Sequence, residues 1–350
     1  MTVGMPSILT QPWNPIGGSN WIYDTSLYRA TGQAAFYSDP YTGISIPVRA
    51  ERAEVDVLTG LPVSSSQDWL TLEFVDEIVV PDDAWVRWDA VNQTFITAGE
   101  YYTETATAFQ RGVVYYEDDL FTTNFWHDGS PLSVGDFVMG MIATFDIGDA
   151  ASANFDAGSA PALELFLSAF KGVRILSTDP LVIETYTDAY GLDAENGLTS
   201  WWPNYGFGEA PWHTVAMGLL ADANGESVFS NAKATELEVD QLNYISGPTL
   251  DILSAKLNGS DDVPGAAAEG YIPYAATMSQ YVSADEAAAR YANIQEFFRR
   301  RGHYWVGTGP FFLQRASRLR VLSFLNGMTP SPIRLSAGLA FPLLQFRKCW

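Results

Sequence analysis

The most constraining feature of the sequence is residues 126–133, WHDGSPLS, which begin at Trp126 and lead directly into an apolar segment. Asp128 and Gly129 form a turn pair, because glycine tolerates positive φ and an aspartate side chain can bond to the backbone that follows. Ser133 is a favourable helix N-cap, and Asp136 three residues later completes a capping box. The apolar residues that follow at helical spacing are Phe137, Val138, Met141, Ile142 and Phe145. The stretch therefore predicts a strand end, a tight turn and a capped helix, a corner that by itself suits any α/β domain.

A second landmark, residues 307–312 (GTGPFF), lies downstream of another predicted helix. Ser283 can cap this helix with Glu286 in the capping box, and Gly302 provides a stop after three arginines in the last turn. An extended segment is then interrupted by Gly307, Thr308, Gly309 and Pro310. Glycines around a threonine also occur in phosphate-binding loops. No Lys-Ser/Thr pair follows here and no helix begins, so a nucleotide loop is not supported.

Predicted strands separated by turn residues fill residues 51–126. They cover 53–57, 69–74, 76–80, 85–88, 94–97 and 112–116. Their spacing of about ten residues predicts hairpins and not a parallel sheet. A short helix over 162–169, a hairpin with strands 171–176 and 181–187, and a mostly helical region over 222–300 follow. The predicted fold class is therefore mixed α/β (α+β).

Composition limits the partners and the chemistry of the protein. The 350 residues are enough for two domains, and the net charge of −22 disfavours nucleic acid and anionic membrane surfaces. The one cysteine allows no internal disulfide and no cysteine-based zinc cluster, and the three histidines are far apart in sequence, so we expect no metal and no cofactor. The first residues show no basic start followed by an apolar run, and no apolar run of about 18 residues exists, so we expect neither a signal peptide in this chain nor a membrane span.

The two landmarks, in this order, resemble the extracytoplasmic solute-binding proteins of the peptide/nickel ABC-importer class, solute-binding protein family 5. The resemblance extends over residues 14–314. It implies a two-lobed, periplasmic-binding-protein-like type II fold that closes on a ligand by hinge motion. Only part of that fold is expected in this chain. The motif residues Trp126, Asp128, Gly129, Gly307, Thr308, Gly309 and Pro310 take a structural role in this interpretation.

What the resemblance implies about function is solute capture without catalysis. A small solute, peptide-like in many members of the class, is bound between the lobes and delivered to a permease in the membrane. The full-length protein would work as a monomer outside the cytoplasm, in the periplasm or on the outer face of the cell membrane. In the peptide-binding members a late aspartate pairs with the amino group of the ligand, and no position in this sequence matches it.

The end of the chain departs from this pattern. Residues 1–296 hold all 41 acidic residues and ten of the 19 Lys/Arg residues, whereas residues 297–350 hold nine Lys/Arg and no acid. Two interpretations remain open for residues 315–350: a basic tail that docks on the acidic body, or an out-of-frame segment that is foreign to the fold. We therefore divide the chain into a solute-binding domain, 1–314, and an out-of-pattern basic tail, 315–350, which we expect not to be integrated into the fold.

Four aromatic residues are the candidate ligand contacts. Trp201, Trp202, Tyr205 and Trp212 lie in a stretch punctuated by Gly and Pro, which we expect to be irregular. Flat aromatic faces on such loops commonly line binding clefts, although each ring could equally fill the core between two lobes.

The search for catalytic patterns leaves one alternative function. No Gly-x-Ser-x-Gly elbow is present, and Cys349 has no neighbouring histidine. The 11 Trp and 17 Tyr residues and the many carboxylates keep a second interpretation open, a secreted carbohydrate-active enzyme or a lectin-like module.

Overall fold

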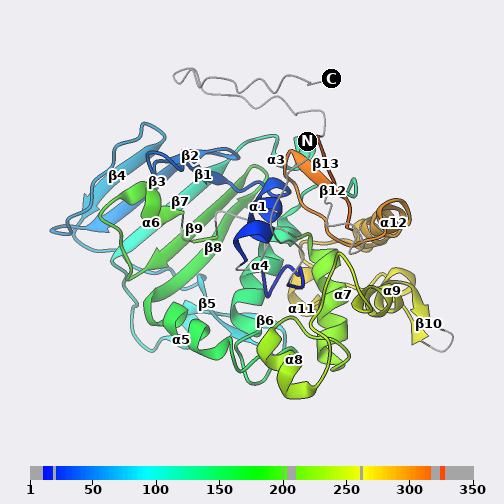
Figure 1. Ribbon diagram of the computed structural model, residues 1–350. Coiled ribbons are helices and arrows are strands. Elements are labelled where there is room, and N and C mark those ends of the chain that lie inside the picture. Colours follow the sequence, from blue (N-terminus) through cyan, green and yellow to red (C-terminus); the bar gives the residue numbers. More distant parts are fainter. Residues whose placement is uncertain are drawn as a thin grey trace, which may run out of the picture.

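The computed structural model describes residues 11–18, 21–199, 201–202, 210–260, 263–316 and 324–327. Within these ranges the protein has a mixed α/β fold, built from one large sheet and a group of helices on one side of it (Figure 1). The helix α4 (Val134–Asp146) lies between the sheet and most of the other helices. Apart from Thr144, its residues are apolar, glycine or acidic. The large core surrounds α4, because almost every residue of this helix is buried.

The large sheet has seven strands in the order β4-β3-β7-β9-β8-β5-β6. Their bounds are β3 Ala50–Leu58, β4 Leu70–Val75, β5 Trp85–Asp89, β6 Thr94–Thr97, β7 Gln110–Tyr116, β8 Phe170–Thr178 and β9 Leu181–Thr187. All neighbouring pairs are antiparallel except β3 and β4, which run parallel. The expectation of hairpins throughout was therefore wrong for β4, because the segment between β3 and β4 crosses back along the sheet before pairing.

The alternation of side chains assigns the two faces of the sheet. On β3, Ala53, Val55 and Val57 are buried in the large core, whereas Glu54 and Asp56 project to the opposite face. The central strand β9 is buried along its whole length. A second small core explains this burial, because it covers part of the outer face. Its members are Ile78, Val80, Ala84, Val86, Ala98, Ala108 and Tyr186.

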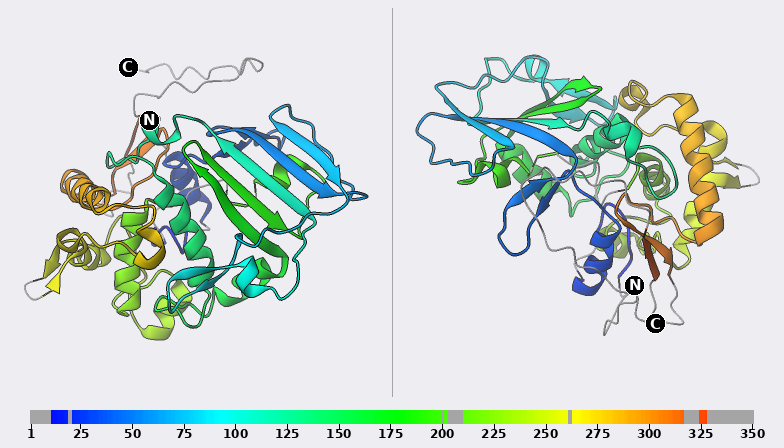
Figure 2. Two further views of the ribbon diagram at one scale, coloured as in Figure 1. Left: turned by 180° about the vertical axis from the view of Figure 1, so that it is seen from behind. Right: turned by 90° about the horizontal axis from the view of Figure 1, so that it is seen from above.

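The remaining helices lie mainly beyond α4, as both views in Figure 2 show for α12. They are α1 Ile22–Ala30, α2 Ala98–Tyr101, α3 Leu120–Thr123, α5 Ala160–Ala169, α6 Ala194–Leu198, α7 Trp212–Ala223, α8 Asn231–Leu237, α9 Thr249–Asn258, α10 Ala266–Glu269, α11 Ala275–Met278 and α12 Ala284–Arg301. Small antiparallel pairs join β1 (Phe36–Ser38) to β2 (Ser45–Pro47), β10 (Gly259–Ser260) to β11 (Val263–Pro264), and β12 (Phe311–Arg315) to β13 (Phe324–Gly327).

The predicted helix caps at Ser133, Ser283 and Gly302 are confirmed, but the predicted capping box at Ser283 is not, because the Glu286 carboxylate bonds to Ser133 and Arg290 instead. At α4, the Ser133 hydroxyl and the Asp136 carboxylate form the capping box. At α12, the Ser283 side chain accepts the Glu286 N–H, and Gly302 ends the helix with φ of 75°.

Two other local predictions were wrong. Residues 76–80 form no strand, and Val79 makes only an isolated bridge to Thr107. Trp212, expected in an irregular stretch, opens the helix α7. Pro211 precedes it, so this proline marks the start of a helix and not a continuing loop.

Part of the predicted tail pairs with the body of the protein. Arg315 is the last residue of β12, and residues 324–327 form β13 alongside it. The rest of the tail, 317–323 and 328–350, lies outside the described residues.

Candidate functional site

The two sequence landmarks meet in the structure. The His127 backbone N–H donates to the Gly307 carbonyl at 2.9 Å, and the Gly307 N–H donates to His127 Nδ1 at 3.2 Å. Because Nδ1 accepts, Nε2 carries the proton of the neutral ring and donates to the Gly309 carbonyl at 2.9 Å. We call the contact between residues 126–128, 305–309 and 31–33 the landmark junction.

The second landmark requires glycine because the backbone of residues 31–32 lies very close to it. A Cβ on Gly307 would lie 2.1 Å from the Thr31 carbonyl oxygen, and one on Gly309 would lie 2.6 Å from both N and O of Gly32. The Gly309 N–H donates to the Thr31 carbonyl at 2.8 Å, and Trp305 Nε1 donates to the Thr31 hydroxyl at 2.9 Å. The glycines of the second landmark therefore allow this segment to pack on the turn after α1.

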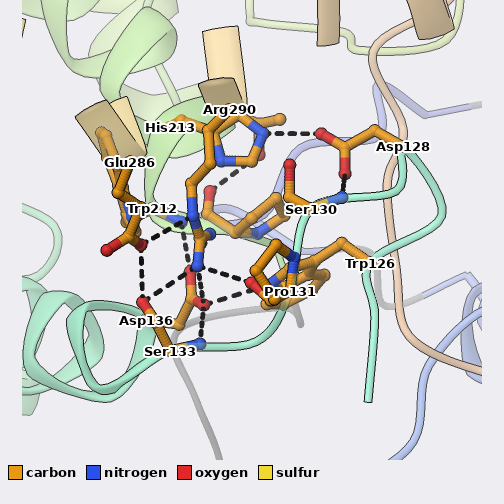
Figure 3. Close-up of polar contacts among 12 residues, drawn as sticks. Trp126, Asp128, Ser130, Pro131, Ser133, Asp136, Trp212, His213, Glu286 and Arg290 are labelled. Carbon is orange, nitrogen blue, oxygen red and sulfur yellow. Dashed lines mark hydrogen bonds and ion pairs between the residues drawn. The ribbon is translucent and has the colours of Figure 1, made fainter. Parts of the chain in front are cut away.

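The first landmark is fixed by a buried carboxylate (Figure 3). Asp136 accepts hydrogen bonds from the Trp126 indole at 3.1 Å, the Ser133 backbone at 3.0 Å and the Trp212 backbone at 3.0 Å. Arg290 of α12 adds a bidentate pair, with both guanidinium nitrogens at 3.0 Å. The side chains of Asp136 and Arg290 are 0% and 1% exposed. This ion pair joins the first landmark, α4, α7 and α12.

Arg290 makes further contacts that satisfy its charge. It donates to the Pro131 carbonyl at 2.7 Å and to the Ser133 hydroxyl at 2.9 Å, and it pairs with Glu286 at 2.9 Å. Burial alone would lower the pKa of Arg290, but the charges of Asp136 and Glu286 outweigh burial and raise it. The buried cation is thus stabilised by two carboxylates.

A second buried pair joins the turn of the first landmark to α7. Asp128 accepts a hydrogen bond from His213 Nε2 at 2.7 Å and one from the Ser130 N–H at 2.9 Å (Figure 3). Burial favours a raised pKa for Asp128, but the His213 charge and these hydrogen bonds prevail and lower it. Both side chains are 0% exposed.

The Asp128–His213 pair has the composition of a catalytic dyad but not its accessibility. Carboxylate–imidazole pairs activate nucleophiles where a substrate can reach them. Here both members are enclosed, His213 Nδ1 has no hydrogen-bond partner among the described residues, and the Ser130 hydroxyl accepts from Asn293 at 3.1 Å. The pair holds the turn against α7 and offers no open reaction site.

The predicted ligand residues separate into different environments. Trp201 and Trp202 are partly exposed and pack on Phe145, Phe166 and Phe170. We call these five rings the aromatic cluster. Trp212 is fully buried at the start of α7, edge-on to Tyr291 at 5.8 Å. Tyr205 lies outside the described residues.

Trp202 has an unusual backbone. Its φ of 22° is positive, which is uncommon for a residue with a side chain. Its indole donates to the Thr144 hydroxyl at 3.2 Å, and its carbonyl accepts from the Tyr116 hydroxyl at 3.2 Å. Two elements of the core therefore hold Trp202 in a strained conformation, which is typical of ligand-contacting and switch positions.

Sequence reasoning missed the buried polar residues. Arg290 is 154 residues from Asp136, and His213 is 85 residues from Asp128. One signal was visible: Arg290 lies on the same helical stripe as Ala287, Ile294 and Phe297, all buried. A charged residue within an apolar stripe indicates a buried partner.

Comparison with known proteins assigns no family. No family model matches the sequence, and no curated protein matches it.

The described part of the chain shows neither a metal-ligand cluster nor a membrane-spanning helix. Its His, Cys, Asp and Glu side chains form no group of three or more that could hold a metal ion. Its helices include none with the length and apolar character needed to cross a bilayer.

Gly309→Ala should destabilise the protein by about 1–3 kcal/mol, because the added Cβ meets backbone atoms that cannot rotate away. Urea unfolding followed by circular dichroism measures the change. Gly158→Ala is the matched control: its nearest neighbour is the Asp156 carboxylate oxygen at 3.2 Å, and we expect a change within about 0.5 kcal/mol. Equal stability of Gly309→Ala and wild type would contradict the close packing at the landmark junction.

Arg290→Met should cost about 3–5 kcal/mol, because it leaves the Asp136 carboxylate buried without its counter-charge. Arg299→Met on the same helix is the control. Arg299 is 71% exposed and, among the described residues, pairs only with Glu296, so we expect a loss of less than about 1 kcal/mol. The double variant Asp136→Asn, Arg290→Met should lose less than the sum of the single changes. Additive losses would mean that the two side chains are not energetically coupled.

Stability should fall as the pH falls from about 6.5 to 4. Burial lowers the pKa of both His127 and His303 to about 4, so the unfolded chain binds these protons first. At pH 5, each histidine should lower the free energy of unfolding by about 2 kcal/mol. His303 accepts the Trp305 N–H at Nδ1, so protonation also breaks this bond. Urea unfolding at several pH values measures the slope, and His303→Gln should flatten part of it. A stability that is constant from pH 7 to 5 would show that the rings are not held neutral.

Proposed function

We propose that this protein is the solute-binding component of an ABC importer, related to solute-binding protein family 5. The observation that carries the proposal is the landmark junction. The two motifs on which the resemblance depends are about 180 residues apart in sequence, yet His127 makes three hydrogen bonds to the Gly307–Gly309 segment. If the two motifs matched the family only by chance, there would be no reason for the two segments to contact each other in the structure.

In this proposal the chain carries part of a two-lobed, type II binding-protein fold. The full-length protein would work outside the cytoplasm, close on its solute by hinge motion and present the closed form to a membrane permease. A peptide-like compound is the solute class that we favour.

The partly exposed rings of Trp201 and Trp202, which pack on the buried rings of Phe145 and Phe170, are the proposed ligand-contacting surface. Trp201 stacks nearly parallel to Phe170, with an interplanar angle of 27°, and Phe170 stacks in the same way on Phe166. Rigid aromatic faces bind ligands at a low cost in conformational entropy. The strained backbone of Trp202 supports the same assignment.

The proposal includes binding without turnover. Its support is that the Asp128–His213 pair, the one carboxylate–imidazole contact among the described ion pairs, is enclosed. The second candidate is a carbohydrate-active enzyme or a lectin-like module. The partly exposed indoles of Trp201 and Trp202 favour it, because sugar rings also bind to flat aromatic faces.

A thermal-shift screen separates these functions. Di- to pentapeptides, nickel chelates and oligosaccharides are tested on the full chain, and each mixture is examined for products by mass spectrometry. Stabilisation by a peptide or chelate without product supports the proposal. Stabilisation by an oligosaccharide alone favours the lectin-like function, and cleavage of any compound overturns binding without turnover.

Trp202→Ala should weaken the binding of a compound found in this way by at least about tenfold, with a modest loss of stability because the ring is partly exposed. Trp212→Ala is the contrasting variant. Its ring is fully buried, so we expect a loss of about 3–5 kcal/mol in stability. Calorimetric titration and urea unfolding measure the two effects. If Trp202→Ala lowers stability as steeply as Trp212→Ala and leaves affinity unchanged, Trp202 is a core residue.

A further inference from the structure

The strand β4 forms an open edge of the large sheet. Figures 1 and 2 place it at the margin of the molecule, and among the described residues it pairs only with β3. The strand at the opposite edge, β6, is shorter, and the Thr277 hydroxyl of α11 donates to the Gln93 carbonyl just before it. An uncovered edge of this kind presents backbone groups that can accept another strand.

The pairing of β4 with β3 identifies which backbone groups face outward. The carbonyls of Trp69 and Val75 accept from Ala53 and Thr59, so odd-numbered residues of β4 face β3. In a parallel pair both backbone groups of alternate residues point the same way. The N–H and C=O groups of Leu72 and Phe74 therefore point away from the sheet.

The surroundings of β4 are rich in acidic residues, of which Glu54 and Asp56 are paired with Arg52 and Arg111. Residues 53–86 contain eight Asp/Glu residues and no Lys, Arg or His. Asp68, Glu73, Asp76 and Glu77 are exposed along or beside the strand. A hollow of about 310 Å³ next to β4 is lined by Glu54, Asp56, Thr71, Glu73 and Arg111. Arg111 is already engaged by Asp56 and Glu184, so it leaves Glu73 uncompensated.

Phe74 supplies an apolar contact at the same edge. Its side chain is 50% exposed, although its neighbours in the core-facing row, Leu70 and Val57, are buried. A strand placed beside β4 would cover this ring. The edge thus combines unpaired backbone groups, negative charge and one large apolar side chain.

We propose that β4 is the docking edge for an extended, lysine- or arginine-bearing segment of a partner protein, which adds to the sheet as an eighth strand. Main-chain hydrogen bonds to Leu72 and Phe74 would give affinity, and the carboxylates would select a basic sequence. This proposal does not depend on the solute-binding function.

A second copy of this chain is a poorer occupant. Antiparallel self-pairing centred on Leu72 would place Asp68 opposite Asp76 of the second copy, and Thr71 opposite Glu73 of the second copy. Like charges directly opposite one another destabilise a strand pair. Charge therefore favours a basic partner over self-association.

Synthetic peptides test the proposal without altering the protein. The probes are a capped Lys-Val-Lys-Val-Lys-Val peptide, its Glu-Val counterpart, and two Lys-Val versions N-methylated at odd or at even positions. Fluorescence anisotropy should show the basic peptide binding at least about tenfold more tightly than the acidic one. One N-methylated peptide should bind and the other should not, because a strand uses alternate N–H groups toward one edge. Equal binding of both N-methylated peptides would overturn the proposal.

Protein variants give an independent test. Leu72→Pro removes an outward N–H that makes no bond to β3, and should weaken peptide binding at least tenfold, a change of about 1.4 kcal/mol. Leu72→Val keeps the N–H and is the matched control. Circular dichroism confirms that both variants are folded. At low salt, the double variant Glu73→Gln, Glu77→Gln should bind the basic peptide more weakly than wild type does. This loss should be only slightly larger than the loss that high salt causes in wild type, since salt screens the same charges.

Two outcomes reject the assigned occupant. Unchanged peptide affinity in Leu72→Pro would show that binding occurs elsewhere. A dimer seen by sedimentation that disappears in Leu72→Pro, together with no peptide binding, would assign the edge to a second copy of the chain.

Discussion

The rest of the structure depends on one buried carboxylate. Asp136 caps the helix on which the large core is built, and the same two oxygens accept from the Trp126 indole, the first residue of α7 and the guanidinium of Arg290. Four segments that are distant in sequence are thereby held in one orientation. A buried ion pair is seldom a large net source of stability, but removing one partner is costly, so it makes one arrangement of α4, α7 and α12 much more favourable than others.

The three histidines show the same use of polar groups. His127 and His303 each accept a backbone N–H at Nδ1 and hold a carbonyl with Nε2, and both lie beside the second landmark. His213 holds the turn of the first landmark through Asp128. Residue types that often carry catalysis here fix loops to one another. This structural use of the histidines supports the proposed function, which is solute binding.

The two surfaces proposed for interaction differ in their chemistry. The aromatic cluster is apolar and rigid, and it lies where α4, α5 and β8 meet. The edge of β4 is acidic and offers backbone hydrogen bonds. An uncharged or amphipathic solute suits the first, and a basic extended segment suits the second. The basic character of the end of the chain contrasts with both, and β13 shows that residues 324–327 pair with the body of the protein.

The sequence by itself determined the local structure: the capping box at Ser133, the cap at Ser283, the turn at Gly129, the stop at Gly302 and most strands. Each depends on residues within a few positions of one another. It also indicated that the two landmarks matter, but not that they touch. Only the tertiary structure decided that β4 runs parallel to β3, that Trp212 begins a buried helix, and that Asp136 meets Arg290 across 154 residues. These outcomes depend on the path of the chain across the sheet and on which side chains are then buried against one another. Neither can be inferred from the spacing of residues that are close in sequence.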